Sequence, residues 1–162
     1  MMSISRVKGM RKMILETQGD ILSANTEAII NTVNCVGVMG KGLALQFKKA
    51  YPENFLYYKE RCDNHYVSIG KMLVYERLTM INPKYIINFP TKRHWRYPSK
   101  MEYIDRGLMD LVKCIEDYNI KTISIPPLGA GLGGLLWPDV KCRIIDTFQQ
   151  LPHVEVYIFN PL

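Results

Sequence analysis

The sequence contains no run of apolar residues close to the roughly 20 that a membrane-spanning helix needs, which argues against an integral membrane protein. Its basic start is followed by no signal-type apolar segment, so secretion is not expected either. The cysteines are widely spaced and never form a CxxC pair, which disfavours structural zinc and a disulfide framework. These cysteines are Cys35, Cys62, Cys114 and Cys142. The absences favour a protein of the reducing cytoplasm, and nothing in the sequence indicates a metal or another cofactor.

The composition is that of one soluble domain with a positive balance of charge. The chain has 162 residues, of which 48% are hydrophobic and 22% are charged, and its formal net charge is +6. This balance favours anionic partners such as nucleic acid, nucleotides or phosphorylated substrates, although the charge also serves solubility alone. Residues 1–12 are expected to be a polar leader, and residues 13–162 a single, monomeric domain.

Strand-like and helix-like hydrophobic patterns alternate along the chain. Strands are predicted at residues 13–18, 27–34, 72–76, 85–89, 122–127 and 154–159. Helices are predicted at residues 43–51, 52–62, 99–115 and around 140–148. Ser99 and Glu102 have the spacing of a capping box, which predicts that Ser99 caps the third helix. The order of elements predicts a layered α/β domain around a mostly parallel or mixed sheet.

Three unusual segments follow predicted strands, at residues 34–42, 90–100 and 126–134. Ligands of α/β sheets bind beyond the carboxyl ends of the strands, so these segments are expected to meet at one site. The first and third are rich in glycine, which lets backbone N–H groups approach an anion closely. Two such loops facing each other predict a diphosphate site, supported by the N-terminus of the helix that follows the first loop.

Neither glycine loop is a Walker A motif, and each loop taken alone is also compatible with a structural turn. Residues 40–42 lack the Ser/Thr and the spacing of a Walker A motif. Gly129, Gly131 and Gly134 fit GxGxxG, but no acidic residue follows at the distance that a dinucleotide fold needs. The evidence for a diphosphate site is therefore the pair of loops rather than either motif.

Two polar residues near strand ends have two interpretations each. Asp20 is the lone carboxylate in these segments, and it either accepts a hydrogen bond from an adenine amino group or caps a turn. Asn34 either bonds a ribose hydroxyl or ties its own loop. The residues alone leave both alternatives open.

Residues 91–100 read TKRHWRYPSK and combine four positive charges with a histidine and two large aromatic residues. The stretch fits a surface loop, a phosphate-binding arm, a single-strand platform or a catalytic loop with a reactive lysine. Arg93, Trp95 and Arg96 have the makeup of a surface on which bases stack and phosphates pair, and packing over the next helix is the alternative. His94 is either a proton carrier or a structural histidine.

Longer motifs at residues 19–21, 30–55 and 125–137 resemble the macrodomain, an ADP-ribose-binding module. Residues 88–96, NFPTKRHWR, resemble its DarG-type branch, antitoxins against a toxin that ADP-ribosylates thymidine in DNA. The resemblance runs from about Thr17 to the C-terminus. It implies a three-layer α/β/α fold with a central mixed, mostly parallel sheet.

The resemblance also implies roles for individual residues. Asp20 and the backbone at Ile21 would hold the adenine, Asn34 would face the distal ribose, and Lys92 falls on the position of the family's catalytic lysine. The rest of the implied ADP-ribose-binding set is Gly40, Lys41, Gly42, Leu128, Gly129, Ala130, Gly131, Leu132 and Gly133. The related animal glycohydrolase carries an aspartate where this chain has Gly133, so its aspartate-assisted route is not implied here.

The leading hypothesis is a hydrolase that removes ADP-ribose from thymidine in single-stranded DNA and so reverses a toxin. The alternatives are removal of ADP-ribose from protein carboxylates, a non-catalytic ADP-ribose reader, and a generic basic nucleic-acid-binding protein. The expected partners are ADP-ribose, ADP-ribosylated single-stranded DNA and a cognate DNA ADP-ribosyltransferase toxin.

Lys92 is the candidate catalytic group because these loops offer no pair of carboxylates such as ordinary glycosidases use. Three roles are open for Lys92. Its neutral amine attacks the anomeric carbon or traps the opened sugar as a Schiff base. Alternatively, its charged form stabilises the departing base electrostatically. Attack needs a neutral amine, and repulsion from Arg93, Arg96 and Lys41 is expected to lower the pKa of Lys92. A bound diphosphate would raise that pKa.

Overall fold

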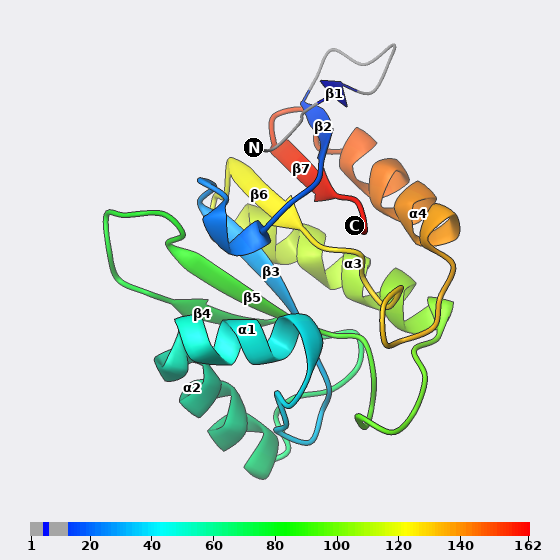
Figure 1. Ribbon diagram of the computed structural model, residues 1–162. Coiled ribbons are helices and arrows are strands. Elements are labelled where there is room, and N and C mark those ends of the chain that lie inside the picture. Colours follow the sequence, from blue (N-terminus) through cyan, green and yellow to red (C-terminus); the bar gives the residue numbers. More distant parts are fainter. Residues whose placement is uncertain (1–4, 7–12) are drawn as a thin grey trace.

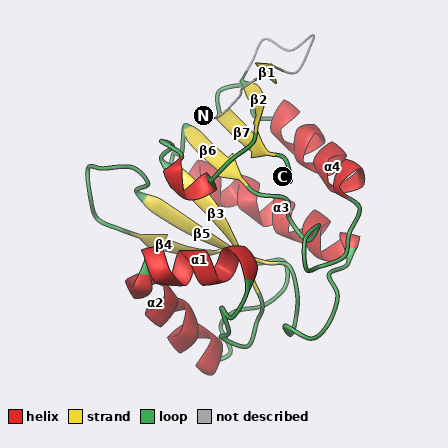
Figure 2. Cartoon of the chain, viewed as in Figure 1, coloured by secondary structure: helices red, strands yellow, loops and turns green. Residues whose placement is uncertain are grey.

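The computed structural model describes residues 5–6 and 13–162, which form seven strands, four α-helices and one short 3-10 helix (Figures 1 and 2). The strands are β1 (Ser5–Arg6), β2 (Ile14–Thr17), β3 (Ala28–Val33), β4 (Leu73–Glu76), β5 (Tyr85–Pro90), β6 (Thr122–Ile125) and β7 (Glu155–Phe159). The helices are η1 (Ile21–Ser23), α1 (Gly42–Ala50), α2 (Pro52–Asp63), α3 (Met101–Asp117) and α4 (Trp137–Gln149). Apart from β1, the leader predicted at residues 1–12 lies outside the described residues.

The strands form one mixed sheet in the order β1-β2-β7-β6-β3-β5-β4. The edge strands β1 and β4 run antiparallel to their neighbours, and the five strands between them are parallel. Helices α1 and α2 cover one face of the sheet, and α3 and α4 cover the other (Figure 1). The predicted three-layer α/β/α fold with a mixed, mostly parallel sheet is confirmed. None of the helices in the described part of the chain is both long and apolar enough to cross a membrane.

Alternate residues of the central strands face opposite layers, as the twofold repeat of a strand requires. On β3, Ala28 and Ile30 belong to the core under α3 and α4, whereas Ile29 packs with Phe47 of α1 on the other face. All three β3 side chains are fully buried. The continuous apolar character of this strand therefore reflects burial on both faces of the sheet.

The predicted capping box at the third helix is wrong. Helix α3 begins at Met101, its N-cap is Lys100, and no side-chain hydrogen bond caps it. Ser99 lies one residue before the cap, and its backbone N–H donates to the carbonyl of Gly133 at 3.0 Å. This contact between segments distant in sequence holds Ser99 outside the helix, and a local helix-start pattern contains no information about it.

Gly107 determines how closely α3 approaches the sheet. A glycine in a helix interior is ordinarily less favourable than alanine. Here a Cβ atom at residue 107 would lie 2.3 Å from Cζ and 2.4 Å from Cε1 of Phe89 on β5. The ring of Phe89 is fully buried, and protein interiors are close-packed, so moving the ring aside is unfavourable. The missing side chain therefore lets the helix backbone pack directly on this ring.

Replacing Gly107 with alanine is expected to lower the free energy of unfolding by about 2 kcal/mol, although alanine favours helices. The overpacking against Phe89 outweighs the gain in helix propensity. Urea unfolding followed by circular dichroism measures the change. The matched control is Met109→Ala on the exposed side of α3, which should change stability little. A Gly107→Ala protein as stable as wild type contradicts the packing argument.

Three buried asparagines connect β3, β5 and α2. Asn31 and Asn88 are partners in the register of β3 and β5, and Asn54 lies in α2. Asn88 donates to Asn54 at 2.8 Å, and its own side-chain oxygen accepts from Asn54 at 3.1 Å and from Asn31 at 3.4 Å. The amide of Asn31 also points at the sulfur of Met39 in the first glycine loop, at 3.9 Å. This polar network therefore lies directly under the loop that follows β3.

Candidate active site

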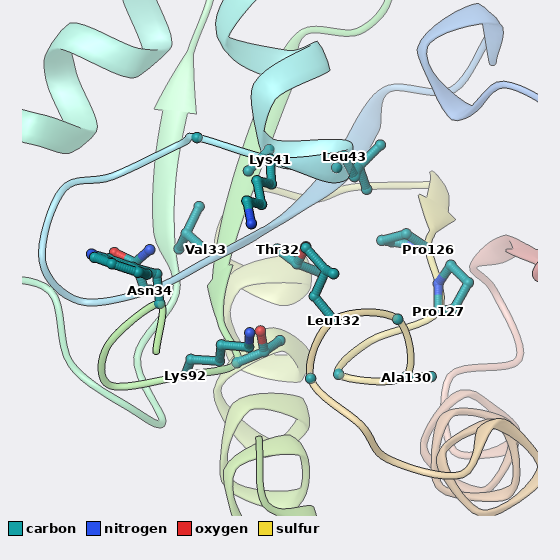
Figure 3. A pocket seen from close by; sticks show the side chains of 18 of the residues that line it. Thr32, Val33, Asn34, Lys41, Leu43, Lys92, Pro126, Pro127, Ala130 and Leu132 are labelled. Atoms are coloured by element: carbon teal, nitrogen blue, oxygen red, sulfur yellow. The ribbon is translucent and has the colours of Figure 1, made fainter. Parts of the chain in front are cut away.

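A cavity of about 640 Å³ opens at the carboxyl ends of β3, β5 and β6 (Figure 3). Parallel pairing of β3 with both β5 and β6 brings these three strand ends to one edge of the sheet. Residues from all three predicted segments, 34–42, 90–100 and 126–134, line the cavity. The predicted convergence of the segments is confirmed.

The first glycine loop is held in shape by Asn34 and Tyr58. The side-chain oxygen of Asn34 accepts from the N–H of Val36 at 3.0 Å, and its amide donates to the carbonyl of Val38 at 2.9 Å. The Tyr58 hydroxyl on α2 lies 2.8 Å from both the carbonyl oxygen and the side-chain oxygen of Asn34. Burial raises the pKa of Tyr58, so this hydroxyl keeps its proton and acts as a donor. Asn34 therefore ties its own loop while also lining the cavity.

Lys41 and Gly42 complete this loop at the start of α1. Gly40, Lys41 and Gly42 all line the cavity, and Lys41 is the N-cap residue of the helix. Figure 3 shows the Lys41 side chain directed from the helix start into the space between the two glycine loops. The cavity thus receives both a lysine charge and the positive end of a helix dipole, which together favour an anion.

The second glycine loop has no room for side chains at two positions. Gly129 has φ of 68°, which favours glycine, and a Cβ atom there would lie 2.8 Å from the side chain of Leu135. A Cβ atom at Gly133 would lie 2.4 Å from both the carbonyl oxygen of Gly129 and the hydroxyl oxygen of Ser99. An aspartate in place of Gly133 could not fit without moving the backbone. The packing of the loop therefore leaves no room for a carboxylate side chain at residue 133.

Lys92 lies half-buried at the cavity, one residue after the buried Thr91. Backbone hydrogen bonds join its segment to the first loop, because Thr91 donates to Val33 at 2.9 Å and Cys35 donates to Arg93 at 3.3 Å. The Cys35 thiol, whose pKa burial raises, also points at the carbonyl of Lys92, at 3.5 Å. The backbone of Lys92 is therefore anchored on both sides.

Burial lowers the pKa of Lys92 below its ordinary value. Repulsion from Arg93, Arg96 and Lys41, which the sequence suggested as the cause, does not account for the shift. Arg93 instead donates to the hydroxyl of Tyr103 on α3 at 3.2 Å, and Arg96 stacks over the ring of Trp95 at 4.7 Å. Both guanidinium groups are thus engaged with aromatic side chains.

Aromatic rings gather beside Lys92 at the cavity. Trp95 lines the cavity and remains 48% exposed. The ring of His94 lies 5.1 Å from that of Trp95 and 5.2 Å from that of Tyr97. The Nδ1 atom of His94 accepts a hydrogen bond from the N–H of Arg96 at 3.1 Å, and His94 does not line the cavity. An exposed indole next to a cationic group suits stacking of a nucleobase.

Three residues of the expected ADP-ribose-binding set lie outside the cavity lining. Asp20 is exposed, and its carboxylate accepts from the N–H of Leu22 at 3.0 Å and from the hydroxyl of Ser23 at 3.3 Å. Ile21 and Leu128 are core side chains, buried on opposite faces of the sheet. Only their backbone atoms can face a ligand.

Several residues that line the cavity were not among the individual site residues that the sequence suggested. They are Thr32, Val33, Val38, Leu43, Ala44, Thr91, Pro126, Pro127 and Pro161. Most lie at the ends of strands or at the start of a helix, where their side chains are small or apolar. Some lie within the three predicted segments or next to them in the sequence, and for Pro161 the sequence held no signal.

The family model for the Macro domain matches residues 30–144. The chain belongs to the macrodomain family. A DNA ADP-ribosyl glycohydrolase of Mycobacterium tuberculosis is 56% identical over 149 residues, which are 92% of this macrodomain and 42% of that protein. The solved macrodomain of Mycobacterium tuberculosis DarG superposes with a TM-score of 0.92 at 55% identity, covering 93% of this chain and 99% of that one.

A second relative joins two activities in one chain. The DNA ADP-ribosyl transferase-DNA ADP-ribosyl glycohydrolase fusion protein of Thermosipho africanus is 33% identical over 163 residues, 90% of this macrodomain and 41% of that protein. The structure of Thermosipho africanus DarTG in complex with ADP-ribose has a TM-score of 0.87 at 30% identity, covering 96% of this chain and 43% of that one. This macrodomain therefore spans about two fifths of the length of the curated relatives that it matches.

Proposed function

We propose that this macrodomain hydrolyses the bond between ADP-ribose and thymidine in single-stranded DNA, and so reverses a DNA-modifying toxin. The observation that carries the proposal is the half-buried Lys92, which lines a cavity together with both glycine loops. Among the described residues, no carboxylate lines this cavity. The described lining of the cavity therefore lacks the two carboxylates that an ordinary glycosidase mechanism needs, whereas it contains the amine that a lysine-based mechanism needs.

The two glycine loops suit the diphosphate of ADP-ribose. Residues 129–133 and residues 40–42 line one cavity, and the side chain of Lys41 adds a positive charge. Glycine-rich turns let backbone N–H groups approach an anion closely, which suits a diphosphate there. Asn34 lies at the end where the distal ribose would reach Lys92. The adenine would extend past the cavity towards η1, where Asp20 and the backbone of Ile21 are assigned to it by family resemblance.

Hydrolysis breaks the bond between the anomeric carbon of the distal ribose and the base, and water supplies a hydroxyl to the sugar and a proton to the base. A neutral Lys92 attacks the sugar carbon or captures its opened aldehyde, and water then releases the amine. A charged Lys92 instead stabilises the negative charge that develops on the departing base. His94, on the same segment, is the proposed proton carrier.

The exposed aromatic and basic residues beside Lys92 suit a nucleic-acid substrate. Trp95 offers a ring at the cavity for the modified base, and Arg93 and Arg96 supply charges for neighbouring phosphates. The Mycobacterium tuberculosis relative is a DNA ADP-ribosyl glycohydrolase, which supports DNA as the substrate. The Thermosipho africanus fusion supports a DNA ADP-ribosyltransferase as the cognate toxin.

The test is an oligonucleotide that carries one ADP-ribosylated thymidine. Incubation with the protein should yield free ADP-ribose and the unmodified oligonucleotide, both measured by mass spectrometry. A peptide that carries ADP-ribosylated glutamate serves as the matched protein substrate. Release from the glutamate peptide but not from DNA contradicts the proposal and favours the protein substrate. Tight binding of ADP-ribose with no turnover of either conjugate favours a reader.

A further inference from the structure

Ser99 carries a buried hydroxyl that has no hydrogen-bond partner within the described part of the chain. The residue is 6% exposed, and it does not cap α3. Its backbone is fixed by the hydrogen bond from its N–H to the carbonyl of Gly133. A buried hydroxyl without a partner is destabilising, and most native proteins avoid one. The position therefore needs an explanation other than stability of the free protein.

The hydroxyl lies against the second glycine loop. A Cβ atom at Gly133 would lie 2.4 Å from the Ser99 hydroxyl oxygen and 2.4 Å from the carbonyl oxygen of Gly129. These two oxygen atoms therefore lie on the same side of Gly133. A Cβ atom at Gly129 would also lie 3.2 Å from the Cβ atom of Ser99. Ser99 thus contacts both ends of the loop, while the loop and not Ser99 lines the cavity.

The geometry of the peptide unit links this hydroxyl to an anion in the cavity. In a planar trans peptide, the N–H of one residue and the carbonyl of the residue before it point in opposite directions. The N–H groups of Ala130 and Gly134 already donate to the carbonyls of Pro127 and Gly131, at 3.2 Å each. When the N–H groups of residues 131–133 turn towards a diphosphate, the carbonyls of residues 130–132 turn away from the cavity. Ser99 lies against the backbone to which those carbonyls belong.

We propose that Ser99 is a positioning residue for the diphosphate-binding loop. Its hydroxyl donates to a carbonyl of residues 130–132 once the N–H groups of that loop hold a diphosphate. The inference rests on the proposed function, because it takes the second glycine loop as the diphosphate site. Ser99 destabilises the free protein and stabilises the ligand-bound loop, so binding of the ligand relieves an unfavourable contact that the free protein retains.

The substitution Ser99→Ala should therefore act in opposite directions on stability and on binding. The thermal midpoint of the free protein should rise by about 3 °C, because the unpaired hydroxyl is gone. The dissociation constant for ADP-ribose, measured by calorimetry, should increase about 3- to 10-fold, because one hydrogen bond of the bound loop is lost. Binding of ADP should weaken by the same factor. Adenosine has no phosphate, so it should bind to Ser99→Ala as tightly as it binds to the wild-type protein.

Ser124→Ala is the matched control. Ser124 on β6 is fully buried, and its hydroxyl is paired with that of Thr26 at 2.9 Å. Removing this hydroxyl should lower the thermal midpoint by about 3 °C and leave the dissociation constant for ADP-ribose unchanged.

Three results would overturn the role of Ser99. The first is a lower thermal midpoint in Ser99→Ala, as in the control, and the second is an unchanged dissociation constant for ADP-ribose. The third is equal weakening of adenosine binding and ADP-ribose binding, since that pattern indicates general damage to the site. Failure of the wild-type protein to bind ADP-ribose refutes the proposed function itself. Wild-type binding with no effect of Ser99→Ala refutes only the inference about Ser99.

Discussion

Replacing Lys92 with alanine is expected to reduce kcat on ADP-ribosylated DNA about 10³-fold, equivalent to roughly 4 kcal/mol of transition-state stabilisation. The cavity offers no carboxylate among its described lining residues to take over the role of the amine. Binding of free ADP-ribose should persist, because the two glycine loops remain intact. Single-turnover release of ADP-ribose from the modified oligonucleotide measures the loss.

Lys100→Ala is the matched control for this prediction. Lys100 lies on the same basic stretch, but it is exposed and does not line the cavity. Its removal should leave kcat within about twofold, as expected for a surface charge away from the reacting atoms. Equal release of ADP-ribose by wild type and Lys92→Ala would remove Lys92 from the mechanism.

The pH dependence of kcat separates the two roles proposed for Lys92. An amine that attacks the sugar must be neutral, so kcat should rise with pH through the pKa of Lys92 and level off above it. Because burial lowers this pKa, the rise should begin at lower pH than for an ordinary lysine. An ammonium that stabilises the departing base gives the opposite slope over the same range. Lys92→Arg, always charged, should keep partial activity only in the second case.

Replacing Asn88 with alanine is expected to lower the free energy of unfolding by about 4 kcal/mol and the thermal midpoint by roughly 10 °C. The side chain of Asn88 has three hydrogen bonds to Asn54 and Asn31, and one to the carbonyl of Leu73 at 3.2 Å. Its removal leaves the buried amide of Asn54 without these partners in a layer that excludes water. Urea unfolding and calorimetry measure the loss.

A double-mutant cycle tests whether the asparagines act as one network. Once Asn88 is alanine, the further change Asn54→Ala should cost much less than it does in wild type, because its partner is already gone. Asn64→Ala, at the exposed end of α2, is the control and should change stability by less than about 1 kcal/mol. Additive costs of Asn54→Ala and Asn88→Ala would show that the network is not coupled.

Much of the fold could be predicted from the sequence, because the signals for it are local. The alternation of polar and apolar residues marked β2, a stretch rich in β-branched residues marked the buried strand β3, and short apolar stretches marked β4 and β5. Strands alternating with helices then restrict the connections to a mostly parallel sheet, and parallel strands bring their carboxyl ends to one edge. The position of the site, between residues 34–42, 90–100 and 126–134, follows from that rule alone.

Only the tertiary structure decided which side chains reach the cavity and what each one contacts. Ser99 matches a capping box, yet its backbone bonds to Gly133 and its hydroxyl lies under a loop more than 30 residues away in sequence. Glycine is unfavourable inside a helix, yet residue 107 is a glycine because the helix backbone packs on Phe89 there. The pKa of Lys92 is lowered by burial rather than by its charged neighbours. Close packing and burial arise between segments that are distant in the chain, so short-range sequence patterns determine the elements and the site's location but not the contacts that tune it.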